Sequence, residues 1–178
     1  MTARRWLAVP LAAVALAPAQ AADYMSVEQA QHLMFPEAGG FEPLTKTVDA
    51  ARSQRLDHIA RVQSTVEPRI WAVRGGGNII GYFAMHHVIG KQEYISYAVG
   101  LDAGGRVKDV EILAYRESHG YEIRNPAWRA QFAGKNAAAP IQLEQDIVNI
   151  SGATLSARHV TDGVRRIVAL VDMISRGN

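Results

Sequence analysis

Apolar and polar residues alternate along the middle of the chain in the way that is typical of β-strands. Four runs rich in β-branched and aromatic residues are expected to be strands, at residues 69–74, 79–88, 93–101 and 106–115. Glycine-containing turn sequences follow the first run, at Gly75–Asn78, and the third, at Asp102–Gly105. Such short turns join antiparallel neighbours, so the pattern predicts a meander of three or four strands.

The C-terminal part of the chain has helical spacing instead. From Ser156 onward, apolar residues recur at intervals of four and three, which places them on one helix face. These residues are Val160, Val164, Ile167, Val171 and Ile174. We expect Ser156 to be the N-cap of this helix, and Arg158, Arg165 and Arg166 to lie on its solvated face.

Three shorter helices and one further strand complete the expected elements. Ser26 and Gln29 fit a capping box, which predicts a helix that ends near Phe35. Residues 48–62 also have helical spacing, and Pro126 opens a short helix through Phe132. Residues 141–150 are expected to form a strand. Together these elements predict an α+β fold, in which helices pack on an antiparallel sheet.

The first 21 residues have the features of a secretory signal peptide. Arg4 and Arg5 precede an apolar run, and Ala19-Gln20-Ala21 matches the small-residue cleavage pattern. The apolar run is shorter than the roughly 20 residues that span a bilayer, so we expect cleavage after Ala21 and export to the periplasm. The mature chain is expected to have no transmembrane helix.

Removal of the leader changes the charge of the chain. The full sequence carries a net charge of +2, but the leader holds two arginines and no acidic residue. The 157 remaining residues have 17 basic and 17 acidic side chains, so nucleic acid is not an expected partner. The absence of cysteine excludes disulfides, thiolate metal sites, cysteine-held iron–sulfur clusters and covalent haem c attachment.

The segment Ser151-Gly152-Ala153-Thr154-Leu155-Ser156 is the strongest candidate site in the sequence. Small residues let the backbone approach a ligand closely, and a helix follows directly. The free N–H groups and the dipole of a helix N-terminus favour a phosphate group there. Taken by itself, the spacing also fits an ordinary turn between a strand and a helix.

The same segment resembles the signature of the FMN-binding domain family, which includes covalently flavinylated components of the Na+-translocating NADH:quinone reductase and of the Rnf complex. In that family the threonine of the motif carries FMN through a phosphoester bond. An FAD:protein FMN transferase makes this bond outside the cytoplasm. The resemblance therefore implies that Thr154 carries covalent FMN, with Ser151, Gly152, Ala153, Leu155 and Ser156 around it.

A second segment supports the resemblance. Glu117-Ser118-His119-Gly120 resembles a Glu-Thr-Pro-Gly turn that lies near the flavin ring in the family, and residues 125–135 resemble the short helix that follows it. His119 stands in place of the usual proline. A histidine beside a flavin ring would stabilise negative charge on it. Val148 stands six residues before Thr154, where many members have aspartate, with Asn149 and Asp146 nearby.

These observations predict three segments: a signal peptide at 1–21, a helical extension at 22–65 and an FMN-binding domain at 66–178. We expect an exported electron-transfer flavoprotein that serves a redox partner or a membrane electron-transfer complex, rather than a self-sufficient oxidoreductase. No catalytic residue and no metal site is predicted. Two alternatives remain at this stage: a reductase that passes electrons from FMN to a quinone or ferric chelate, and a binding or assembly module without flavin.

Overall fold

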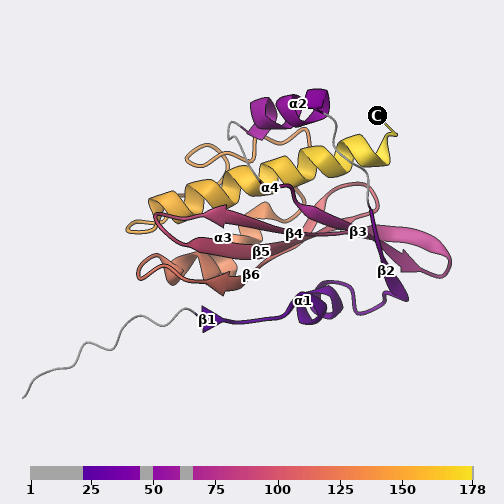
Figure 1. The fold of residues 1–178 in the computed structure, drawn as a ribbon, viewed down its shortest axis with the longest axis horizontal. Coiled ribbons are helices and arrows are strands. Elements are labelled where there is room, and N and C mark those ends of the chain that lie inside the picture. Colours follow the sequence, from indigo (N-terminus) through magenta and orange to yellow (C-terminus); the bar gives the residue numbers. More distant parts are fainter. Residues whose placement is uncertain (1–21, 45–49, 61–65, 178) are drawn as a thin grey trace, which may run out of the picture.

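The fold is built on one six-stranded sheet in which every neighbouring pair of strands is antiparallel (Figure 1). The computed structural model describes residues 22–44, 50–60 and 66–177, so the predicted signal peptide lies outside the described residues. The strand order is β1-β6-β5-β4-β3-β2. The strands are β1 (Ala22–Asp23), β2 (Gly40–Pro43), β3 (Arg69–Gly75), β4 (Asn78–Ile89), β5 (Tyr94–Asp102) and β6 (Val107–Tyr115).

The four predicted central strands are confirmed as β3, β4, β5 and β6. Successive side chains of a strand point to opposite faces of the sheet, and both faces are covered here. On β4, Tyr82 and Ala84 belong to one buried cluster, while Phe83 between them belongs to the other. The short edge strands β1 and β2 come from the N-terminal segment. We did not predict them, since two to four residues carry too little alternation to be recognised.

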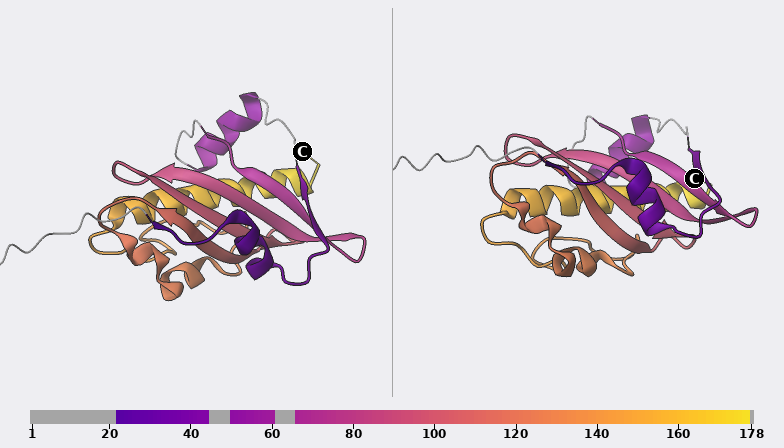
Figure 2. Two further views of the ribbon diagram at one scale, coloured as in Figure 1. Left: turned by 60° about the horizontal axis from the view of Figure 1, so that its bottom comes forward. Right: turned by 90° about the horizontal axis from the view of Figure 1, so that it is seen from below.

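A helix covers each face of the sheet (Figures 1 and 2). Helix α4 (Thr154–Ser175) packs on β4 and β5, and α1 (Val27–Met34) packs on β5 and β6 from the opposite side. Gly163 permits the close approach of α4, because a side chain there would collide with the Tyr97 hydroxyl on β5. Helix α2 (Ala50–Ala60) lies on the outer side of α4. The predicted α+β fold is therefore confirmed.

The chain between β6 and α4 closes one end of the main core. It forms η1 (Tyr121–Arg124), which was not predicted, followed by α3 (Pro126–Arg129) and η2 (Ala130–Phe132), which together span the predicted short helix from Pro126 to Phe132. Trp128 is buried, and its indole N–H donates to the backbone oxygen of Val148 at 2.8 Å. This bond ties the short helix to the segment that leads into α4.

The prediction of a strand at 141–150 is wrong. Its apolar residues Ile141, Leu143 and Ile147 are buried, but from an irregular loop in which an isolated bridge joins Leu143 to Ile147. The Asp146 carboxylate holds the loop by accepting from the N–H of Gln142 at 2.7 Å and from Lys135 at 2.9 Å. These apolar residues are therefore apolar because they are buried, and not because they belong to a strand of the sheet.

Two details predicted for α4 are also wrong. The helix begins at Thr154 with Ala153 as its N-cap, and Ser156 is a buried residue of the first turn. Arg165 and Arg166 are buried, whereas Arg158 is exposed as predicted. Arg165 and Arg166 contact α2, and Arg165 also contacts the loop at 141–150. The local pattern does not reveal these neighbours.

Arg166 anchors the α2 region to the core. Its guanidinium is fully buried and pairs with Asp57 on α2 and, at 2.8 Å, with Glu67 before β3. The carboxylates stay 28% and 42% exposed, while Arg166 Nε has no hydrogen-bond partner among the described residues. An unpaired charge therefore costs more free energy on the buried Arg166 than on either of its partly exposed partners.

We expect the double variant Asp57→Ala/Glu67→Ala to lose more stability than Arg166→Met. The double variant leaves a buried cation unpaired, which costs about 3–5 kcal/mol of unfolding free energy. Arg166→Met leaves two carboxylates that water already reaches. Denaturant unfolding of both variants tests the order, and a larger loss in Arg166→Met would contradict it.

His86 links the same region to the sheet in its neutral form. The Val66 carbonyl lies 2.8 Å from Nε2 and the Tyr97 hydroxyl 2.9 Å from Nδ1. Since a carbonyl only accepts, Nε2 carries the proton and Nδ1 accepts from Tyr97. Burial lowers the pKa of His86, against the opposing effect of the Val66 carbonyl.

This lowered pKa predicts that acid weakens the fold at His86. As the pH falls below about 6.5, the unfolded chain takes up the proton first, so the stability contributed by neutral His86 is lost. His86→Gln retains a donor and an acceptor but does not titrate. We expect the stability of the wild type relative to this variant to fall between about pH 7.5 and pH 5.5, in denaturant unfolding. An equal difference at both pH values would refute this role.

Candidate functional site

The candidate site lies where the ends of β4 and β6 meet the beginning of α4. Strand register places Tyr115 opposite Ile95, and Ile89 opposite Tyr94, so the last residues of β4 and β6 lie at the same end of the sheet, beside the start of β5. A cleft of about 470 Å³ opens there, within the range of about 300–1,000 Å³ typical of small-molecule sites. Its lining is Lys91, Gln92, Glu117, Ser118, His119, Gly152, Ala153, Thr154, Leu155 and Ser156. The two predicted segments therefore border one cleft.

A buried tyrosine joins the two segments. The Tyr115 hydroxyl donates to the backbone oxygen of His119 and lies 3.1 Å from Ser156 Oγ. Because the single phenolic proton goes to a carbonyl, the Ser156 hydroxyl donates to the Tyr115 oxygen. Burial raises the pKa of Tyr115, in opposition to the Ser156 hydrogen bond, so the phenol stays protonated. Ser156 thus fixes the position of α4 instead of capping it.

Gly120 allows the turn after β6 to pack against the start of α4. Its φ of +94° lies in the left-handed region. A Cβ at this position would lie 2.5 Å from the Tyr115 hydroxyl and 3.2 Å from Ala153 Cβ. Gly120 does not itself line the cleft but determines how closely its two walls approach.

Glu117 organises the third wall, which is the loop between β4 and β5. Its Oε1 accepts from the backbone N–H groups of Lys91, Gln92 at 2.6 Å and Glu93 at 2.9 Å. Partial burial opposes ionisation, but these three donors together hold the pKa of Glu117 below its ordinary value. The ionised carboxylate therefore holds this loop in place, and the three backbone donors stabilise its negative charge.

The motif residues differ in how accessible they are. Thr154 is half-buried at the first position of α4, and its Oγ1 accepts from Asn149 at 3.3 Å. Leu155 is 46% exposed, and Ser151 lies in an exposed turn just outside the cleft lining. The N-cap Ala153 offers no side-chain oxygen, so the first N–H groups of α4 remain available to an anion.

The sequence did not reveal Lys91 and Gln92 as site residues. They enter the cleft because strand register brings the β4–β5 loop beside Glu117, a relation that no local motif encodes. Lys91 places a cationic side chain in the lining, and Ser118 Oγ lies 2.9 Å from His119 Nδ1. His159, in the second turn of α4, contacts the Ile89 carbonyl.

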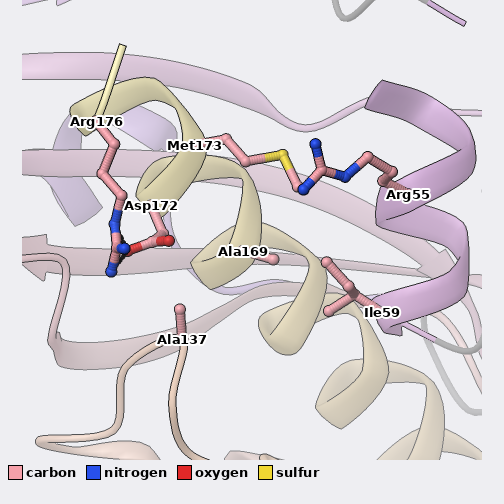
Figure 3. Close-up of a pocket in the computed structure, with 7 residues that line it drawn as sticks. All are labelled: Arg55, Ile59, Ala137, Ala169, Asp172, Met173 and Arg176. Atoms are coloured by element: carbon pink, nitrogen blue, oxygen red, sulfur yellow. Dashed lines mark hydrogen bonds and ion pairs between the residues drawn. The ribbon is translucent and has the colours of Figure 1, made fainter. Parts of the chain in front are cut away.

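A larger cavity of about 710 Å³ lies elsewhere, between α2 and α4 (Figure 3). Ile59 and Arg55 of α2 border it on one side, and Ala169 and Met173 of α4 on the other. It contains none of the motif residues. Among the described residues, no group of three or more histidine, aspartate or glutamate side chains is arranged to hold a metal ion. The smaller cleft is therefore the site where the predicted chemistry converges.

Gly120→Ala tests the contact between the two walls. Gly134→Ala is a matched control, because Gly134 also has a positive φ, +77°, but its Cβ would meet no atom within 4 Å. Both variants bear backbone strain of about 1–2 kcal/mol, and Gly120→Ala adds an overpacking cost of about 1–3 kcal/mol. Denaturant unfolding measures the difference. Equal losses in the two variants would show that Gly120 is not a packing requirement.

Comparison with known proteins agrees with this geometry. The model of the FMN-binding domain family matches residues 90–169, which contain the β4–β5 loop, the Glu117–Gly120 turn and the Ser151–Ser156 motif. A search of curated proteins found no match. Among the described residues, no helix has both the length and the apolar character needed to cross a membrane. Over residues 90–169 this chain is therefore similar to the FMN-binding domain family, as the two motifs predict.

Proposed function

We propose that the protein is an exported, periplasmic electron carrier whose FMN is attached to Thr154 through a phosphoester bond. The observation that carries this proposal is the convergence of Glu117–His119 and the Thr154 motif on one cleft, within the family-matched segment. Several lining residues are exposed, among them Lys91, His119 and Leu155. A redox group held there would be close to the protein surface, which suits electron exchange with a partner protein.

The start of α4 fits the phosphate end of FMN. The uncapped N–H groups and the helix dipole stabilise negative charge at this terminus. Of the three motif hydroxyls, the Ser156 hydroxyl is engaged with Tyr115 and Ser151 lies outside the lining. Thr154 alone of the three combines a place in the cleft with a hydroxyl that is not bonded to the core. This combination favours Thr154 as the acceptor.

The other walls of the cleft fit the ring end. FMN supplies one- and two-electron redox chemistry when bound. Lys91 and His119 would hold positive charge or a hydrogen-bond donor beside the ring, while Glu117 is kept in place by its backbone donors. Such groups favour added negative charge and would raise the reduction potential.

The proposed maturation partner is an FAD:protein FMN transferase that acts outside the cytoplasm. The signal-peptide pattern of residues 1–21 supports export to that compartment. A covalent bond also suits an exported protein, because a dissociated flavin would be diluted outside the cell. The partner that supplies or receives the electrons would meet the exposed rim of the cleft.

Thr154→Ala tests the attachment. In cells that also produce the transferase, we expect the wild-type protein to retain flavin absorbance after acid precipitation, and Thr154→Ala to retain none. Ser151→Ala is the matched control and should load normally, because Ser151 lies outside the lining. Circular dichroism checks that all three proteins fold. Acid-stable flavin on Thr154→Ala would refute the acceptor assignment, and a colourless wild type would refute covalent attachment.

A further inference from the structure

We propose that Asn149 and Glu144 form a positioning pair that fixes the Thr154 hydroxyl for flavin attachment. The pair is visible as a chain of hydrogen bonds that ends on the acceptor oxygen. Asn149 Nδ2 donates to Thr154 Oγ1 at 3.3 Å and to Glu144 Oε1 at 3.2 Å. This inference rests on the proposed function, in which Thr154 is the acceptor.

The orientation of the Asn149 amide follows from its three partners. Oδ1 accepts from the N–H of Ile150 at 2.8 Å, while the two Nδ2 hydrogens serve Glu144 and Thr154. A reversed amide would place its oxygen against the Glu144 carboxylate and its NH2 group against an N–H donor. The group that faces Thr154 is therefore a hydrogen-bond donor.

The loop holds Glu144 in an unfavourable backbone conformation. Its φ of +67° lies in the left-handed region, which costs free energy for a residue with a side chain. The Glu144 N–H donates to the Ile147 oxygen at 2.8 Å. The adjacent Asp146 carboxylate also fixes the loop, because it accepts from the N–H of Gln142. Such strain persists only where the surroundings impose it, and here it accompanies a carboxylate that orients Asn149.

Two other positions near Thr154, residues 146 and 148, supply no carboxylate to its hydroxyl. Asp146 is occupied by Lys135 and by the N–H groups of the loop, so it is not available to Thr154. Val148, six residues before Thr154, is apolar and 68% exposed. The carboxylate that acts on Thr154 in this chain is therefore that of Glu144, and it acts through Asn149.

The chemistry of attachment explains the value of a donor at this position. Thr154 Oγ1 forms a bond to the flavin-side phosphorus of a flavin adenine dinucleotide. The phosphoanhydride bond breaks, AMP leaves with the electron pair, and the hydroxyl proton passes to a base on the transferase. No atom is oxidised or reduced. By donating to Thr154 Oγ1, Asn149 fixes the hydroxyl and leaves the hydroxyl proton of Thr154 free for removal. The same donor stabilises the negative charge that develops on Oγ1.

Two measurements on the full chain test the pair. The variants are Asn149→Ala, Asn149→Leu and Glu144→Gln, with Glu122→Gln as a control that removes another exposed carboxylate outside the cleft lining. In flavin-free protein, NMR couplings should show one Thr154 χ1 rotamer in the wild type and averaging in both Asn149 variants. With the transferase, FAD and magnesium, intact-mass spectrometry should show loading slowed at least about tenfold in those variants. Glu144→Gln should be slowed less, and Glu122→Gln should match the wild type.

The outcomes separate this inference from the proposed function. Wild-type loading rates together with an unchanged Thr154 rotamer in both Asn149 variants would overturn the positioning pair and leave covalent attachment intact. A wild type that acquires no FMN would overturn the attachment, and the rotamer measurement would still decide whether Asn149 fixes Thr154. Thermal unfolding of each variant excludes loss of the fold as the cause of slow loading.

Discussion

The site depends on the hydrogen bonds of the Tyr115 hydroxyl. This buried phenol sits at the end of β6, donates to the His119 backbone and accepts from Ser156 in the first turn of α4. It thereby fixes the turn after β6 against the helix that follows the motif. Gly120 keeps the contact short enough for Ala153 to pack beside it. This link therefore joins the two segments of the site directly.

The remaining structure holds the elements that this link joins. Helix α4 is aligned along the sheet by its buried apolar face and by the close approach at Gly163. The loop that leads into α4 is fastened by the Asp146–Lys135 pair and by the bond from Trp128 to Val148. The β4–β5 loop is fastened by Glu117. Each wall of the cleft is therefore held by a polar contact between distant segments, on a scaffold that apolar packing provides.

Local patterns were sufficient where one principle decides the structure. Alternation identified the four central strands, and the capping box of Ser26 and Gln29 identified α1. Local patterns failed where a distant partner decides. Ser156 has the sequence position of an N-cap but bonds to Tyr115, and Arg166 has a polar side chain but is buried against Asp57 and Glu67. The motif residues were predicted from a resemblance, whereas Lys91 and Gln92 enter the site through strand register, which the local sequence did not specify.

Peptide mapping tests the central proposal most directly. Trypsin cleaves after Lys135 and Arg158, so one peptide contains Ser151, Thr154 and Ser156. Tandem mass spectrometry of protein produced with the transferase should locate FMN on Thr154. FMN on Ser151 or Ser156, or an unmodified peptide with all flavin released on denaturation, would contradict the proposed attachment.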